Sequence, residues 1–337
     1  MAEQCNECKN PILEVKDLRV KFSVHKKWLA AVDGVNLCIQ PGEIIGVVGE
    51  SGSGKSVMSQ SILRLRDHDT AVQYEGEILF ENEDLLKRPL SQMRDIRGNK
   101  ISIIFQDPLN SLSPVHTVGK QLSEIIFLHK KMTKYEVKER AIEMLKLTGI
   151  PNPEVCMKKY PFELSGGMQQ RVMIAMALAC EPKLLIADEP TTALDVTIQE
   201  QILHLIKQLN EKLGMSVLFI THDMGAVAQL CHSIKVMYLG QVVEDATTEE
   251  LFANPLHPYT EGLLACIPHL GVERGKHLPT ISGTVPPLTK VPVGCHFCTR
   301  CEYADKRCME QQPPLVEVRD GHWVKCWKYA DQQTKEV

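Results

Sequence analysis

Two short motifs in this 337-residue chain carry residue types suited to binding phosphate groups. The first runs from Gly49 to Ser56 and has the spacing Gly-x-x-x-x-Gly-Lys-Ser. Its glycines allow backbone angles that turn successive N–H groups towards a phosphate chain, while Lys55 supplies a cation and the Ser56 hydroxyl a magnesium ligand. The motif predicts a nucleotide site, whose contacts in this loop are Gly49, Ser51, Gly52, Ser53, Gly54, Lys55 and Ser56.

The second motif is Leu164-Ser165-Gly166-Gly167-Met168-Gln169. It resembles the signature sequence of the ATP-binding cassette (ABC) proteins and matches it without a departure. In that family, the signature of one subunit closes over ATP held by the phosphate loop of its partner. The resemblance therefore implies a head-to-tail dimer, with nucleotide contacts from Ser165, Gly166, Gly167 and Gln169.

A pair of carboxylates ends an apolar run that begins at Leu184. In isolation, Asp188 and Glu189 are also consistent with a strand followed by an acidic helix cap. In this motif order they resemble the family's Walker B motif, which implies that Asp188 holds Mg²⁺ and that Glu189 acts as general base towards the attacking water.

Three further residues receive roles from the resemblance. Gln106 follows the apolar run Ile101–Phe105 and matches the glutamine loop, which implies contact with Mg²⁺ or the water. His222 follows Val217–Thr221 and matches the switch histidine, which implies a hydrogen bond to the γ-phosphate. Phe22 lies where relatives place an aromatic ring against adenine, although its alternation with Leu18 and Val20 is equally consistent with a core position.

Composition excludes several classes of function. The chain has 38 Lys and Arg against 42 Asp and Glu, for a net charge of −4, which provides no basic field for a nucleic-acid backbone. Lys130, Lys131 and Lys134 form only a local cluster. The chain has no run of 18 apolar residues and no signal peptide at its start, so we expect a cytoplasmic protein that does not cross a membrane by itself.

The elements that must position these residues are short apolar runs that alternate with helical patterns. The runs predict an α/β sandwich around a mainly parallel sheet. They are Ile44–Gly49, Ile101–Phe105, Leu184–Asp188, Val217–Thr221 and Ile234–Leu239. By resemblance, the fold is a P-loop NTPase cassette with antiparallel strands in residues 12–40 and 72–100 and a helical subdomain at about 107–180.

Two helices have clear boundary signals. Thr133 and Glu136 form a capping box that predicts a helix ending near Gly149. Thr197 and Glu200 form a second box, and the apolar stripe that follows it predicts a helix as far as Gly214.

Composition changes after residue 254, where prolines become frequent and cysteines gather. We expect a cassette in residues 1–254 and a C-terminal extension in residues 255–337. The sequences His257–Leu264 and Ser282–Pro286 resemble the extension found in ATP-binding subunits of dipeptide, oligopeptide and nickel importers. Phe105–Pro108 and Ser111–Pro114 fit the same group, whose usual spelling has Asn at the position of Ser113.

Five cysteines fall within residues 295–326. The resemblance implies a 4Fe–4S cluster held by Cys295, Cys301, Cys308 and Cys326. Zinc is the alternative, since thiolate ligands suit both metals, and the additional Cys298 leaves the ligand choice open.

Together these observations predict an ATPase subunit that powers peptide import at the cytoplasmic face of a bacterial membrane, with ATP and Mg²⁺ as ligands. Nickel or another small solute is the alternative cargo, and a soluble ribosome- or DNA-associated ABC protein is a further alternative. The partners implied are a second cassette subunit in a heterodimer, two integral membrane permease subunits and an extracytoplasmic solute-binding protein, with no nucleic acid.

Overall fold

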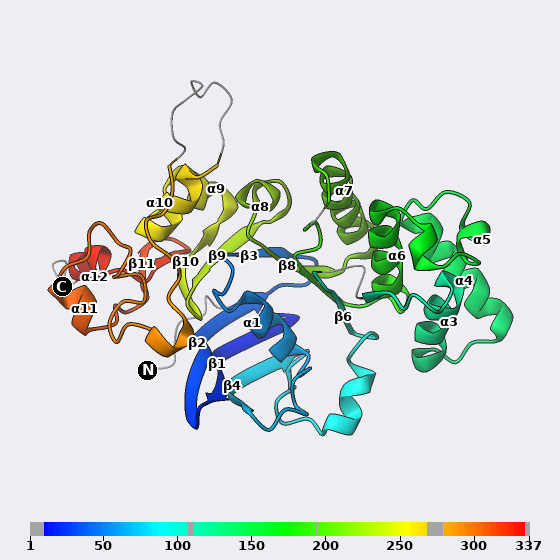
Figure 1. Cartoon of the computed structure of the whole chain (residues 1–337), viewed down its shortest axis with the longest axis horizontal. Helices are drawn as coiled ribbons and strands as arrows, with labels where there is room; N and C mark the ends of the chain where they lie inside the picture. Colours follow the sequence, from blue (N-terminus) through cyan, green and yellow to red (C-terminus); the bar gives the residue numbers. More distant parts are fainter. Residues whose placement is uncertain (1–9, 107–110, 193, 268–278, 334–337) are drawn as a thin grey trace. The chain divides into compact units, whose positions relative to one another are not determined.

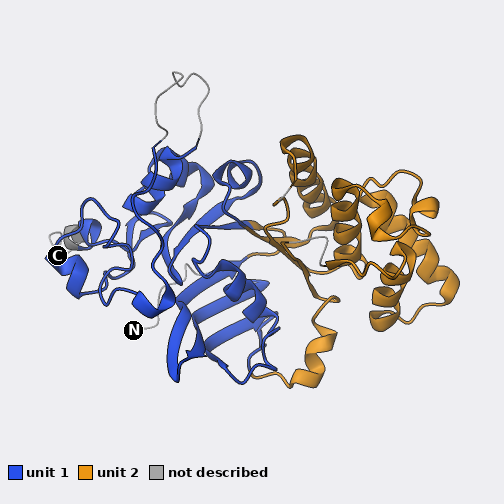
Figure 2. Ribbon diagram, viewed as in Figure 1, with its two compact units in different colours: residues 1–39, 45–86, 221–337 blue, residues 40–44, 87–220 orange. Residues whose placement is uncertain are grey.

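The computed structural model describes residues 10–106, 111–192, 194–267 and 279–333. The chain forms two compact units (Figure 2). Unit 1 comprises residues 1–39, 45–86 and 221–337, and unit 2 comprises residues 40–44 and 87–220. Residues 107–110, the first of the predicted helical subdomain, lie outside the described residues. The predicted domain boundary at residue 254 stays a prediction.

An antiparallel sheet of four strands belongs to unit 1. Its order is β2-β1-β4-β5, and Figure 1 labels β2, β1 and β4 of this sheet. The strands are β1 (Leu13–Val24), β2 (Lys27–Ile39), β4 (Val72–Phe80) and β5 (Glu83–Asp84). His25 and Lys26 join β1 to β2 with φ angles of 49° and 63°. A two-residue turn of this hand matches the twist of the strands that it connects.

Within the described residues, the second sheet has eight strands, five of which belong mainly to unit 1, and the phosphate loop follows β3. These five strands in order are β11 (Val316–Arg319), β12 (His322–Val324), β10 (Gln241–Thr247), β9 (Ser233–Tyr238) and β3 (Ile44–Val48). The β3 strand pairs in parallel with β9, and all of its residues are buried, as expected of a strand covered on both faces. The remaining pairs of this group are antiparallel.

The C-terminal residues contribute two of these strands, which the sequence patterns did not predict. Val324 of β12 pairs with Glu244 of β10. Glu244 is fully buried, and its Oε1 lies 2.8 Å from Nε2 of the buried His322. The same carboxylate accepts hydrogen bonds from the backbone N–H groups of Leu256 and His257, at 2.7 and 2.9 Å. A buried carboxylate with these partners joins the tail to β10.

Short helices complete unit 1. They are α1 (Lys55–Ile62), α8 (Met224–Leu230), α9 (Thr248–Ala253), α10 (Pro258–Ala265), α11 (Lys306–Glu310) and α12 (Trp327–Gln333). Near the C-terminus, Leu256, Val316 and Val324 form a small hydrophobic cluster against which Tyr329 packs.

Unit 2 contains three parallel strands in the order β8-β7-β6. These are β6 (Ile101–Ile104), β7 (Leu184–Asp188) and β8 (Ser216–Thr221), and every residue of β7 and β8 is buried. The helices of this unit are α3 (Val118–His129), α4 (Lys134–Leu147), α5 (Pro153–Cys156), α6 (Gly166–Leu178) and α7 (Val196–Leu213).

The two predicted helix starts have different outcomes. The capping box of Thr133 and Glu136 is present at the start of α4, as predicted. Helix α7 instead begins two residues before the predicted position, because Asp195 Oδ1 accepts a hydrogen bond from the N–H of Ile198 at 3.0 Å. Its end at Gly214, with φ of 63°, is as predicted. None of the helices in the described residues combines the length and apolar character that a membrane span requires.

Candidate functional site

The phosphate loop of unit 1 encloses its own lysine. Lys55 is 4% exposed. Its Nζ donates hydrogen bonds to the backbone oxygens of Gly49, at 2.7 Å, and Glu50, at 3.0 Å, and lies 3.4 Å from Ser53 Oγ. The ammonium group is therefore held within the loop, where a phosphate chain bound by the backbone N–H groups would meet a cation.

Gly49 has no space for a side chain. Its φ is 154°, and a Cβ added there would lie 2.2 Å from the backbone oxygen of Met237 in β9. Gly54, with φ of 100°, is similarly confined, since a Cβ would lie 2.5 Å from the backbone oxygen of Ala31. These contacts fit a loop whose path depends on glycine, as the sequence motif requires.

The Gly49→Ala substitution tests this dependence. We expect the added methyl group to lower the free energy of unfolding by about 1–3 kcal/mol through overpacking, and to weaken nucleotide binding because β3 and the loop must separate from Met237. Gly52→Ala is the matched control, since its Cβ would meet no atom within 4 Å although φ is also positive, at 83°. Denaturant unfolding of both variants measures the two losses of stability. Equal losses would contradict the conclusion that Gly49, unlike Gly52, has no space for a side chain.

His222 and Phe22 are also in unit 1. His222 is exposed, between the end of β8 and Asp223, whose carboxylate caps α8 through the N–H groups of Gly225 and Ala226 at 2.8 and 3.2 Å. Phe22 is half-buried on β1, and the guanidinium carbon of Arg66 lies 5.7 Å from its ring centroid. The Phe22 ring is thus neither a fully buried core residue nor fully exposed.

Unit 2 brings together two of the predicted catalytic side chains. Gln106 Nε2 donates a 2.9 Å hydrogen bond to Glu189 Oε2, and the Thr192 hydroxyl donates to the same oxygen at 3.0 Å. The neighbouring Asp188 ends β7 and is 3% exposed. Glu189 adopts φ of 49°, a strained angle for a residue with a side chain.

The signature residues lie at the start of α6 in unit 2. Ser165 is the N-cap, and its exposed Oγ accepts a hydrogen bond from the N–H of Met168 at 3.4 Å. Gly166 is exposed beside it, so the N-terminus of a 13-residue helix is accessible to an anion from outside. Gln169 is buried instead, and its amide donates to the backbone oxygens of Pro161 and Leu164. These hydrogen bonds join Gln169 to the first residue of the signature and to the 3-10 helix Pro161–Glu163 that precedes it.

The prediction of a 4Fe–4S cluster at Cys295, Cys301, Cys308 and Cys326 is wrong, and so is the zinc alternative. Within the described ranges, no group of three or more His, Cys, Asp or Glu side chains is arranged to hold a metal ion. The cysteines instead line a cavity of about 400 Å³ with aromatic residues such as Trp327. Burial raises the pKa of Cys295 to about 12 and that of Cys326 to about 11.

Two family models match different parts of this chain. Residues 32–192 match the family model described as ABC transporter, and residues 243–308 match the model described as the oligopeptide/dipeptide transporter, C-terminal region. The oligopeptide transport ATP-binding protein OppD of Bacillus subtilis is 51% identical over 94% of this chain and 88% of its own length. The dipeptide transport ATP-binding protein DppD of the same organism is 48% identical over 94% of both chains.

A solved structure supports the same assignment. The dimeric structure of MJ0796, a bacterial ABC transporter cassette, superimposes with a TM-score of 0.62 at 33% identity, over 70% of this chain and 98% of that one. The fold is therefore the ABC ATPase cassette, a mixed α/β P-loop NTPase with two sheets, for which ATP and Mg²⁺ are the expected ligands. The chain belongs to the ATPase subunits of the dipeptide and oligopeptide ABC transporter family.

Proposed function

We propose that this chain hydrolyses ATP to power the import of di- or oligopeptides across a bacterial cytoplasmic membrane. The observation that carries the choice of solute is the C-terminal match at residues 243–308, in a chain that resembles oligopeptide and dipeptide transport proteins over nearly its whole length. Nickel import is the less favoured alternative. A role on ribosomes or DNA is not supported, because the net charge of −4 provides no attraction for a phosphate backbone.

The phosphates of ATP would lie in the loop of residues 49–56, beside the enclosed Lys55 ammonium group. Phe22 is proposed to contact the adenine ring. Ser56, Gln106 and Asp188 would hold Mg²⁺, whose charge offsets that of the phosphate oxygens when it is bound. These assignments rest on the motifs and on the burial of Lys55 and Asp188, which are 4% and 3% exposed.

Hydrolysis requires a base that accepts a proton from the attacking water, and Glu189 is proposed for that task. Its Oε2 is fixed by hydrogen bonds from Gln106 and Thr192, so the carboxylate has a defined orientation before the reaction. Gln106 is proposed to hold the water against the base, and the exposed His222 to donate a hydrogen bond to the γ-phosphate.

The proposed assembly contains two cassette subunits, two membrane permease subunits and an external solute-binding protein, with this chain peripheral at the cytoplasmic face. Exposed Ser165 and Gly166 at the start of α6 support a dimer in which each signature faces the nucleotide of the partner. The related MJ0796 cassette is dimeric in its solved structure. A second cassette of different sequence is proposed as the partner.

The Ser165→Arg substitution distinguishes ATP binding by the phosphate loop of this chain from the contact of its signature with the nucleotide of the partner. We expect the isolated variant chain to bind ATP within about twofold of wild type, because its own phosphate loop is intact, while ATP hydrolysis by the assembled transporter falls at least about tenfold. Ser91→Arg is the control, because Ser91 is also exposed and lies in a 3-10 helix far from the signature in the sequence. Loss of ATP binding by the isolated Ser165→Arg chain would contradict the partner assignment.

The function as a whole is tested with the purified transporter in proteoliposomes. We expect ATP hydrolysis to increase when the solute-binding protein is loaded with a di- or oligopeptide. Labelled peptide should accumulate on the side of the membrane opposite the solute-binding protein. Stimulation by nickel ions but not by peptides would overturn the proposed solute while leaving the ATPase assignment in place.

A further inference from the structure

Glu50, the second residue of the phosphate loop, is contacted by a buried arginine from the C-terminal part of unit 1. Arg300 Nη1 lies 2.5 Å from Glu50 Oε2, and Nη2 lies 3.1 Å from Glu50 Oε1. The two parallel hydrogen bonds make a bidentate pair, which is the geometry that arginine and a carboxylate form most strongly. The Arg300 side chain is 3% exposed, whereas Glu50 is 31% exposed.

The position of Arg300 is itself fixed on several sides. Its Nε donates a 2.9 Å hydrogen bond to the backbone oxygen of Ser282. Its guanidinium carbon lies 5.7 and 5.9 Å from the ring centroids of Tyr238 and Phe297. Such a guanidinium has few alternative positions, so it constrains the carboxylate that it binds.

A second residue from the same part of the chain holds the Glu50 backbone. The Tyr259 hydroxyl accepts a 2.8 Å hydrogen bond from the Glu50 N–H, and Tyr259 is fully buried in α10. Its ring packs against Tyr238 and Phe297, with centroids 4.8 and 5.3 Å apart. Both the side chain and the amide of Glu50 are therefore held by residues that follow position 254.

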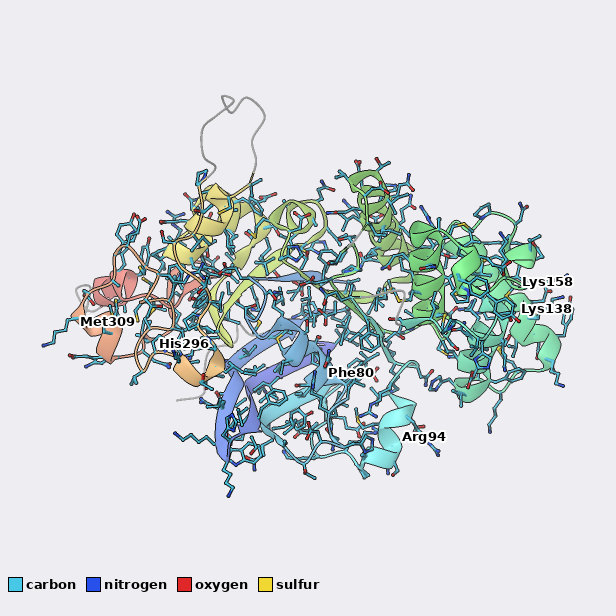
Figure 3. The ribbon with its side chains drawn as sticks, viewed as in Figure 1. Phe80, Arg94, Lys138, Lys158, His296 and Met309 are labelled. Carbon is cyan, nitrogen blue, oxygen red and sulfur yellow. The ribbon has the colours of Figure 1, made fainter. Side chains whose placement is uncertain are left out.

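The segment that carries Arg300 is also fixed to the β9–β10 turn. His296, labelled in Figure 3, has Nδ1 2.9 Å from the backbone oxygen of Leu239. The next residue, Gly240, donates its N–H to the backbone oxygen of Ser53 in the phosphate loop, at 2.9 Å. The loop thus meets the C-terminal residues directly at Glu50 and through this turn at Ser53.

These contacts continue to the lysine of the loop. The backbone oxygen of Glu50 accepts hydrogen bonds from Lys55 Nζ, at 3.0 Å, and from the N–H of Ser53, at 3.2 Å. A displacement of Glu50 would therefore displace the acceptors that place the Lys55 ammonium group.

We propose that Arg300, with Tyr259, is a positioning residue for ATP binding, which holds Glu50 and through it Lys55 in the geometry that receives the phosphates. The inference rests on the proposed binding of ATP at the phosphate loop. It makes nucleotide affinity dependent on residues that lie 250 and 209 positions from Glu50 in the sequence. Neither Arg300 nor Tyr259 needs to touch ATP for this effect.

The test measures the KM and kcat for ATP of the assembled transporter, with ATP affinity measured on the full-length chain. We expect Arg300→Gln to raise KM and the dissociation constant about tenfold, the size of a charge-assisted hydrogen bond, and to change kcat less than about threefold. Arg300→Lys should restore part of the affinity. Arg319→Gln is the matched control, because Arg319 pairs with Glu250 in the same unit and outside the loop.

A mutant cycle separates positioning from a general structural role. If Arg300 acts through Glu50, Arg300→Gln should have little further effect on KM in a Glu50→Gln background. Full additivity of the two substitutions, or a KM for Arg300→Gln within twofold of wild type, would overturn the proposal. Should Arg300→Gln not fold, Tyr259→Phe removes the other contact and should raise KM about threefold, and an unchanged KM would overturn it equally.

An error in the proposed ATP site itself would give a different result from an error in the positioning role of Arg300. If Lys55→Ala binds ATP like wild type, the proposed site itself is wrong. If Lys55→Ala loses ATP while the Arg300 and Tyr259 variants retain wild-type KM, only the positioning role fails.

Discussion

Glu189→Gln is expected to reduce steady-state ATP hydrolysis at least about a hundredfold while ATP binding remains within about twofold of wild type. A glutamine oxygen can still accept the hydrogen bonds that Gln106 and Thr192 donate to Glu189 Oε2, at 2.9 and 3.0 Å. The amide cannot accept a proton from the attacking water at neutral pH. The substitution therefore keeps the local geometry and removes only the proposed base.

The measurement is ATP turnover by the assembled transporter, accompanied by ATP titration of the full-length chain. Glu211→Gln, which makes the same chemical change at an exposed position of α7, is the control. Turnover within about threefold of wild type would remove Glu189 from the chemical step, because a general base contributes on the order of a hundredfold or more. If hydrolysis is blocked in this way, the variant should also accumulate as an ATP-bound closed dimer.

The elements that the sequence predicted well are those whose signals are local. The runs that became β3, β6, β7, β8 and β9 are bounded within about a residue of the predicted positions, because most of their residues are apolar and buried. The start of α7 was misplaced because two caps overlap there. Asp195 precedes Thr197, and its carboxylate caps the helix before the threonine can do so.

The C-terminal part was less predictable, for two physical reasons. Strands β11 and β12 contain four and three residues, too few for a pattern, and they form by pairing next to β10. The bidentate contact of Arg300 with Glu50 joins residues 250 positions apart, and neither residue type signals a distant partner. The sequence patterns therefore predicted the phosphate loop but not Arg300 and Tyr259, which hold Glu50 of that loop in place.

The cysteine prediction was wrong because spacing does not determine the chemical state of a thiol. Five cysteines within 32 residues are typical of metal sites, and the family resemblance pointed the same way. Burial beside aromatic rings raises the pKa of these thiols, and within the described residues the arrangement that a metal needs is absent. The thiols instead line a cavity together with aromatic side chains of the tail.

Lys55→Ala is expected to raise the dissociation constant for ATP by at least about tenfold, because a hydrogen bond between two charged groups contributes roughly 1.5–3 kcal/mol. The effect should exceed that of Arg300→Gln. Alanine removes the cation that would meet the phosphates, and it also frees the backbone oxygens of Gly49 and Glu50, which lie 2.7 and 3.0 Å from Lys55 Nζ.

Calorimetric titration of the full-length chain with ATP and Mg²⁺ measures this change, and Lys207→Ala, at an exposed position of α7, is the control. An affinity within about twofold of wild type would contradict the proposed phosphate site. Thermal unfolding without nucleotide separates the loss of the cation from the loss of the hydrogen bonds within the loop. The cation affects binding only when ATP is present, whereas the loop hydrogen bonds affect stability without ATP. A variant that unfolds like wild type and fails to bind ATP would therefore assign the effect to the charge of Lys55 on the phosphates.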